Sequence, residues 1–338
     1  MLTGLHIQNY RQFRDFKVEG LKRFNLIVGD NGVGKSALLE AVWLLVNDGD
    51  VEALLDILKH RGEHSPEKWR SAQSRDWMTS PLASFAGTLD EQSAIAECWL
   101  TALQGSANGS TLDITVDFSQ FSEGRIAYKA IRDNHKMMGR RLPAAITDRS
   151  RGRFKERRDG GIFLLPSGLA DDLAIELWYE VALTDKEAVL EEMLRQFSPG
   201  IERVSLGRAG EPIVKLKDSP SPVPLGRLGE GASRLFGLGI AALSAQGGVF
   251  LVDEIESGLY RDRMSDVWLF LAHWAHQLDF QVFATTHSWD CIAGFAEAST
   301  MANERELFRL ERDVAGMRVV RYGEELLATA ARNGIEVR

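Results

Sequence analysis

Cysteine is scarce in this chain, and long hydrophobic runs are lacking. Its 338 residues include two cysteines, Cys98 and Cys291, which are too few for a disulfide framework and too far apart for a zinc motif. The longest apolar stretch, residues 235–245, is broken by glycines and is too short to cross a membrane. The first residues lack the basic and apolar segments of a secretory signal. We therefore expect a cytoplasmic protein with reduced thiols and no membrane contact.

Positive charge is also in deficit, except in one segment. The net charge of −8 argues against a protein coated in nucleic acid. Residues 132–158, however, hold ten basic and three acidic side chains, a local net charge of +7. Apolar residues are sparse there, which predicts an exposed segment. Four of its arginines are candidates for contact with DNA phosphates or an acidic partner, with a solvated loop as the alternative: Arg151, Arg153, Arg157 and Arg158.

A glycine- and lysine-containing octet, residues 29–36, is the most informative pattern present. It matches G-x-x-x-x-G-K-S between a predicted strand, residues 24–28, and a predicted helix, residues 37–45. Its glycines let successive N–H groups point at phosphate oxygens, its lysine reaches the β- and γ-phosphates, and its serine binds Mg²⁺. The alternative is a glycine-rich turn with an incidental lysine. We expect ATP and Mg²⁺ as cofactors, held by Asn31, Gly32, Val33, Gly34, Lys35, Ser36 and Ala37.

Polar residues follow two further predicted strands, residues 249–252 and 281–284. Asp253, at the end of the first strand, is placed to hold Mg²⁺, and Glu254 is placed to polarise an attacking water. His287, after the second strand, is placed to donate to the γ-phosphate. Solvated carboxylates and a structural histidine are the alternatives. Beside a phosphate loop, we favour the catalytic interpretation.

A second anion-binding helix start is predicted at Gly229, Glu230 and Gly231, before the apolar stretch that follows. Because the chain already has a complete phosphate loop, this second site suggests a nucleotide that is shared between two chains.

The remaining pattern predicts an N-terminal hairpin, residues 5–18, and a capping box at Thr184 and Glu187. We expect residues 1–48 to form one ATPase lobe and residues 161–338 the second. The region between them, residues 49–160, is predicted to be mainly helical, apart from a strand at residues 112–118.

The order of these motifs resembles an ABC-type ATPase head. Residues 5–13 resemble the opening of the RecF and OLD (overcoming lysogenization defect) branch, and residues 253–259 and 281–288 are similar to OLD-like and abortive-infection ATPases. The resemblance implies an α/β P-loop fold with a mixed sheet, short N-terminal antiparallel strands and an inserted helical subdomain.

The resemblance also implies hydrolysis of ATP to ADP and phosphate in a head-to-tail homodimer. It gives Lys35, Glu254 and His287 catalytic roles, and it makes Ser36 and Asp253 the metal ligands. It further implies that the signature, which reads the partner's γ-phosphate, and the D-loop, which couples the two sites, are formed by Gly229, Glu230, Gly231, Ser257, Gly258 and Leu259.

Two departures from the family pattern leave the function open. Gly229 replaces the usual signature serine. The Q-loop glutamine is also not assigned: the candidates are Gln73 and Gln92. OLD proteins carry a nuclease domain after the head, but no Asp-x-Asp pair follows His287, so we expect a separate nuclease or other effector. The main hypothesis is a clamp or switch in a DNA-linked process, above all antiviral defence. The alternatives are a scaffold with little hydrolysis and a RecF-like DNA repair ATPase.

Overall fold

A computed structural model describes most of the chain, with gaps. The described residues are 1–63, 83–90, 92–104, 107–119, 125–133, 135–143, 157–158, 160–208, 210–314 and 316–333. Within these ranges, no helix is both long and apolar enough to span a lipid bilayer.

A largely parallel sheet forms the centre of the molecule, with the strand order β17-β16-β3-β15-β14-β10-β9. The five inner strands run parallel and the two edge strands are antiparallel to their neighbours. β3, β14 and β15 are buried along their whole length, as expected for parallel strands that are covered on both faces. The strands are β3 (Phe24–Gly29), β9 (Arg157–Arg158), β10 (Gly161–Leu164), β14 (Val249–Val252), β15 (Gln281–Thr285), β16 (Arg305–Asp313) and β17 (Gly316–Tyr322).

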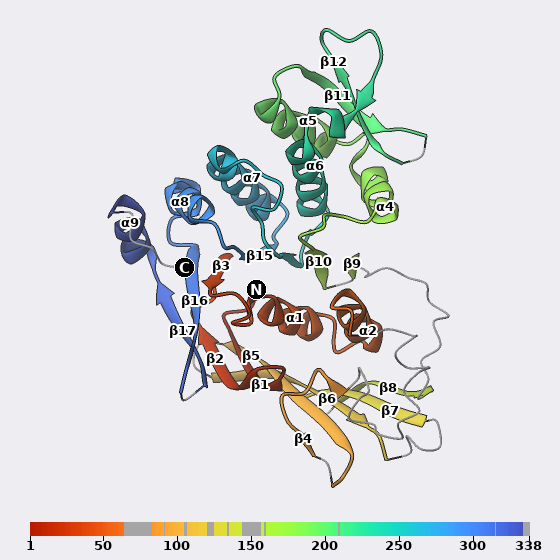
Figure 1. The fold of residues 1–338 in the computed structure, drawn as a ribbon, viewed down its shortest axis with the longest axis vertical. Helices are drawn as coiled ribbons and strands as arrows, with labels where there is room; N and C mark the ends of the chain where they lie inside the picture. Colours follow the sequence, from red (N-terminus) through yellow and green to blue (C-terminus); the bar gives the residue numbers. More distant parts are fainter. Residues whose placement is uncertain are drawn as a thin grey trace.

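Helices cover both faces of this sheet (Figure 1). Leu26 and Val28 of β3 point into one hydrophobic core together with three helices: α6 (Glu230–Leu243), α7 (Met264–Gln277) and α8 (Trp289–Glu297). Ile27, between them, points into a second core with α1 (Lys35–Val46) and α2 (Val51–His60). The period-two alternation of a strand therefore divides the sheet between two cores. Near the C-terminus, α9 (Glu324–Asn333) packs beside α8.

An antiparallel sheet closes the second core, on the far side of α1 and α2 (Figure 1). Its strand order is β2-β1-β5-β6-β7-β8, and β4 pairs with β5. The N-terminal hairpin predicted from the sequence is confirmed by its first two strands. The strands are β1 (Gly4–Tyr10), β2 (Phe13–Glu19), β4 (Leu89–Asp90), β5 (Ile95–Gln104), β6 (Ala107–Asp117), β7 (Arg125–Arg132) and β8 (His135–Pro143).

The expectation of a mainly helical region at residues 49–160 is therefore wrong for the part that is described. Only α2 follows the helical prediction, whereas residues 95–143 contribute four strands of the antiparallel sheet. In β5, Ala96, Cys98 and Leu100 are buried and alternate with more exposed residues. The residue types in this strand favour helix, but one-sided packing against α1 and α2 decides in favour of the sheet.

A small helical part with three short strands lies at the end of the molecule away from the antiparallel sheet (Figure 1). Its helix α5 begins after Thr184, whose hydroxyl accepts the N–H of Lys186, while the Glu187 carboxylate accepts the N–H of Leu183. Thr184 is thus the predicted N-cap, but the Glu187 carboxylate bonds the residue before the cap, one position earlier than in a standard capping box. The elements are α4 (Asp171–Val181), α5 (Asp185–Phe197), β11 (Ile201–Leu206), β12 (Pro212–Leu216), β13 (Val223–Pro224) and the short 3-10 helix Leu225–Leu228 before α6.

Candidate ATP site

The phosphate loop connects the end of β3 to the start of α1. Gly32 and Gly34 have φ angles of +73° and +114°, which favour glycine and let the loop turn its amides toward one point. The Lys35 ammonium donates to the carbonyl oxygens of Gly29 (2.7 Å) and Asp30 (3.0 Å). Burial lowers the pKa of Lys35, and the nearby Asp253 carboxylate opposes this shift. A buried cation at a helix N-terminus fits the phosphates of a nucleotide.

The other predicted residues of the loop divide between its tip and the core. Asn31 and Gly32 are exposed, whereas the side chains of Val33 and Ala37 are buried in the core with α1. Ser36, in the first turn of α1, is half-buried. The loop is therefore anchored on one side and open on the other, as binding of a polyphosphate requires.

Asp253 follows β14 and is nearly buried, with 8% of its surface exposed. Its Oδ1 atom accepts a hydrogen bond of 2.5 Å from the Thr285 hydroxyl, at the end of the adjacent strand β15. The same hydroxyl oxygen accepts the backbone N–H of Glu254 at 2.8 Å. Thr285 thus ties the predicted metal ligand to the predicted catalytic residue. Sequence analysis missed this role, although the Thr-Thr pair before His287 marks the strand end.

The structure brings Glu254 and His287 close together. The Nε2 atom of His287 is 3.9 Å from Oε1 of Glu254, and the hydroxyl of Ser257 donates to Oε2 of Glu254 at 3.2 Å. Glu254 has a φ angle of +48°, in the left-handed region. For a residue other than glycine, this backbone conformation is unfavourable by on the order of 1 kcal/mol or more. The N–H of His287 donates to Glu256, which fixes the backbone beside the imidazole. The strained backbone holds a carboxylate where a water could be polarised.

Ser36 and Asp253 line one cavity of about 150 Å³. A hydroxyl and a carboxylate are hard oxygen donors that suit Mg²⁺, which takes its remaining ligands from phosphates and water. The end of α2 brings His60 and Arg61 to the same cavity, a contribution that sequence analysis missed. Burial lowers the pKa of His60, opposed by the Glu40 carboxylate.

The predicted signature and D-loop meet on one surface. Gly229, the N-cap of α6, is exposed and has a φ angle of +108°, and a Cβ atom added there would have no neighbour within 4 Å. A Cβ atom added to Gly231 would lie 2.9 Å from the carbonyl oxygen of Gly258. The exposed side chain of Glu230 and the half-buried side chains of Ser257 and Leu259 lie in the same two segments.

The signature helix is also connected to the catalytic residue. Arg234 of α6 is buried and donates to the carbonyl oxygens of Leu165 (2.6 Å) and Glu254 (3.4 Å). Burial lowers the pKa of Arg234 to about 10, opposed by the carboxylate of Glu256, so its side chain stays charged at neutral pH. A movement of α6 would therefore shift the hydrogen bond between Arg234 and the Glu254 carbonyl, and with it the backbone of Glu254.

The arginines at the end of the basic segment, residues 132–158, are held in ion pairs within the protein. Arg151 and Arg153 lie outside the described residues. Arg157 is paired with Glu180, and Arg158 forms ion pairs with Asp50 (2.5 Å) and Asp56 (2.8 Å). The expectation that Arg157 and Arg158 present free cations to DNA is therefore not met. Since the side chain of Arg158 is only 12% exposed, its role is to hold the end of the segment against α2.

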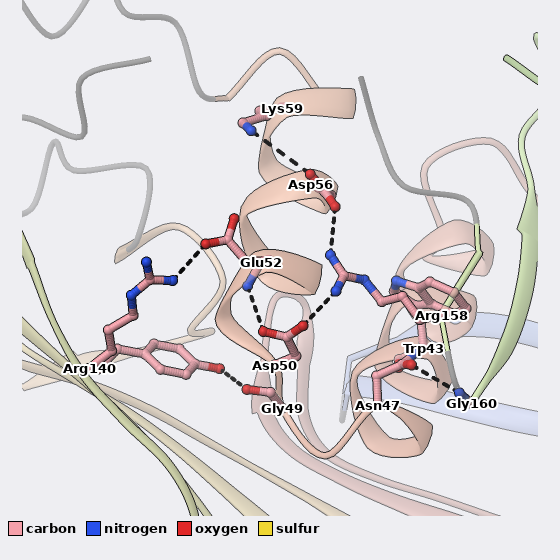
Figure 2. A network of polar contacts seen from close by, with 11 residues as sticks. Trp43, Asn47, Gly49, Asp50, Glu52, Asp56, Lys59, Arg140, Arg158 and Gly160 are labelled. Carbon is pink, nitrogen blue, oxygen red and sulfur yellow. Dashed lines mark hydrogen bonds and ion pairs between the residues drawn. The ribbon is translucent and has the colours of Figure 1, made fainter. Parts of the chain in front are cut away.

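Figure 2 shows how this contact belongs to a wider network around the start of α2. Asp50 caps the helix by accepting the N–H of Glu52, and Arg140 of β8 pairs with the Glu52 side chain at 2.7 Å. The hydroxyl of Tyr128 donates to the carbonyl oxygen of Gly49 at 2.7 Å. The network fixes the beginning of the helix whose other end reaches the cavity at Ser36.

Comparison with solved structures gives the fold. An SMC head bound to the C-terminal winged-helix domain of ScpA aligns with a TM-score of 0.57 at 14% identity, over 96% of this chain and 98% of that chain. An SMC head with an extended coiled coil from Pyrococcus furiosus, bound to the C-terminal domain of ScpA, aligns with a TM-score of 0.54 at 13% identity, over 99% and 100% of the two chains. The fold is that of an ABC-ATPase head.

Sequence comparison gives the family. A family model described as "AAA ATPase domain" matches residues 1–152, and one described as "AAA domain, putative AbiEii toxin, Type IV TA system" matches residues 180–290. An ATP/GTP phosphatase of Helicobacter pylori is 24% identical over 93% of each chain. The RecF protein of Trichormus variabilis is 30% identical over 35% of this chain and 28% of its own length. Together these matches give an ATPase with the fold of an ABC-type head, and they are consistent with the RecF- and OLD-like branch. The ATPase binds and hydrolyses ATP.

Replacement of Thr285 by valine tests the connection between Asp253 and Glu254 in this ATPase. Valine keeps the shape but removes the donor to Asp253 and the acceptor for the Glu254 N–H. We expect the rate of phosphate release to fall roughly 10-fold, because the side chains of Asp253 and Glu254 lose their fixed orientation. The control is Thr101→Val, which removes a buried hydroxyl in β5 that bonds across the antiparallel sheet to Thr111. Equal rates for the two variants would contradict the connection.

Proposed function

We propose that two copies of this ATPase bind two Mg²⁺–ATP complexes between them, head to tail, and that hydrolysis releases the pair. One observation carries the proposal: the exposed start of α6 and the D-loop form one surface, but they pack into a different core from the phosphate loop. Ala232 and Leu235 of α6 belong to the first core, whereas Val33 and Ala37 belong to the second. A second anion-binding helix start, separate from the first, fits a phosphate held by the partner's loop.

Each residue would then have a defined task in the composite site. Lys35 and the N-terminus of α1 hold the phosphates, and Ser36 and Asp253 would hold Mg²⁺. Mg²⁺, when bound, neutralises charge that develops on the phosphates. Glu254 takes the proton of the attacking water, and His287 donates to the γ-phosphate.

Gly229→Asp tests the shared site. Light scattering should show that wild-type mass doubles in Mg²⁺–ATP, whereas the variant stays monomeric because its carboxylate repels the partner's γ-phosphate. The variant should still bind ATP, since Gly229 is not part of its own phosphate loop. Gly316→Asp is the matched control: it also replaces an open glycine with a positive φ angle, +130°, but in the β16–β17 hairpin. It should dimerise like the wild type.

Two results would refute the shared site. The first is a constant wild-type mass with and without Mg²⁺–ATP. The second is undiminished dimerisation of the Gly229→Asp variant, which would place the anion-binding helix start outside the interface.

A regulatory scaffold is the second candidate, and the backbone at Gly229 favours it. Its φ and ψ angles of +108° and 162° suit glycine. Because glycine stands where the family has serine, position 229 offers no hydroxyl to the γ-phosphate. Binding of ATP would then assemble the chain around a partner with little turnover. In cells, a scaffold should keep its function in a Glu254→Gln variant and lose it in a Lys35→Ala variant, whereas a hydrolytic clamp should lose its function in both.

The cellular process is part of the same proposal. The match to a model named for a type IV toxin–antitoxin protein supports antiviral defence with a separate effector, such as a nuclease. The matches to RecF support a DNA-linked process. Phage plaque counts on cells with wild-type or Lys35→Ala protein test the first process, and equal counts would argue against it.

A further inference from the structure

The tip of the β1–β2 hairpin is held more firmly than a two-residue turn needs to be. Tyr10 pairs with Phe13, so Arg11 and Gln12 form the turn. Arg11 has a φ angle of +50°, and its N–H donates to the carbonyl oxygen of Phe85 at 2.7 Å. Its guanidinium pairs with Glu40 and Glu63, each at 2.9 Å. These contacts fix where the next residue lies.

Gln12 lies directly against the phosphate loop. A Cβ atom added to Gly34 would be 2.0 Å from the Nε2 atom of Gln12 and 3.1 Å from the ring of Phe13. The amide therefore occupies the space that a side chain at position 34 would need. Among the described residues, none forms a side-chain hydrogen bond with Gln12, although its amide offers two donors.

We propose that Gln12 is a phosphate-binding residue of the ATP site, whose amide donates to the α- or β-phosphate of the bound nucleotide. The backbone of a phosphate loop cradles these two phosphates, so a donor in contact with Gly34 lies beside them. The Arg11 guanidinium, by contrast, is already paired with the carboxylates of Glu40 and Glu63. The hairpin thus offers a neutral donor to nucleoside diphosphates and triphosphates alike. The proposal rests on the ATP site and does not depend on dimerisation.

Equilibrium binding of fluorescent ATP and ADP analogues to the full chain tests this role without turnover. Gln12→Glu replaces a donor by a like charge, and we expect it to weaken both nucleotides at least about 10-fold. Gln12→Ala should weaken both by roughly 3- to 10-fold, and Gln12→Arg, which keeps a donor, should bind at least as tightly as the wild type. The matched control, Gln8→Glu, makes the same exchange in β1, opposite Asp15 and Trp99, and should leave affinity unchanged.

The outcomes separate the proposal from its alternatives. Wild-type affinity in a folded Gln12→Glu variant, checked by its thermal midpoint, would overturn it. Loss for ATP alone would also overturn it, because the contact would then be to the γ-phosphate. A reduced affinity of Gln12→Arg would assign the residue a packing role only. Lys35→Ala must abolish binding in the same assay; if it does not, the ATP site itself is misplaced.

Discussion

Glu254→Gln should lower the rate of phosphate release by at least about 100-fold while ATP still binds. A general base contributes this much when it takes a proton from the attacking water, and an amide cannot take one. The exchange keeps the size of the side chain and its contact with the Ser257 hydroxyl. The backbone hydrogen bond to Thr285 is also retained, so the site should keep its shape.

Single-turnover hydrolysis and ATP affinity, measured on the same preparation, check this expectation. Glu202→Gln, an exposed site in β11, is the control and should hydrolyse ATP at the wild-type rate. If binding of ATP weakens in step with the rate, Glu254 acts in binding the nucleotide. If neither changes, another residue activates the water.

Glu40→Gln should lower the free energy of unfolding by about 3–5 kcal/mol, the usual cost of removing one partner from a buried ion pair. Glu40 is 4% exposed and faces two guanidiniums: Oε1 is 2.5 Å from Arg61, and Oε2 is 2.9 Å from Arg11. The Tyr10 hydroxyl also donates to it at 3.2 Å. Burial, reinforced by the charge of Glu40, raises the pKa of Tyr10, so the phenol remains a donor. A neutral amide would leave the buried Arg11 and the partly exposed Arg61 without their shared carboxylate.

Urea unfolding followed by tryptophan fluorescence measures this loss. Glu63→Gln provides the comparison, because the Glu63 side chain is 28% exposed and, among the described residues, pairs with one arginine, Arg11. It should cost about 1 kcal/mol or less. If the two variants lost equal stability, the buried carboxylate would have no special role.

The sequence predicted those parts of the site that depend on neighbours along the chain. The phosphate loop, the buried strands β3, β14 and β15, and the N-cap of α5 each show their pattern within a dozen residues. Such patterns reflect backbone geometry and burial on both faces of a sheet, which do not depend on knowing the distant partner.

The sequence could not reveal contacts between distant segments. Arg158 looks like part of a solvated basic run until Asp50 and Asp56, about a hundred positions earlier, are placed beside it. Thr285 and His60 carry no motif, and only the folding of β15 and α2 brings them to Asp253 and its cavity. The strand β5 was missed because its residue types favour helix, and the surface that selects a sheet is supplied by other segments.

The place of β3 in the central sheet affects how the protein is made. Its two neighbours are β15 and β16, which come from the last fifth of the chain. On the ribosome, both edges of β3 therefore stay bare until residues 281–313 have left the exit tunnel. Bare strand edges attract incorrect pairing, so the nascent chain is a natural client for chaperones. The phosphate loop is synthesised well before β15 and β16, so its supporting sheet can close only after both of these later strands have emerged.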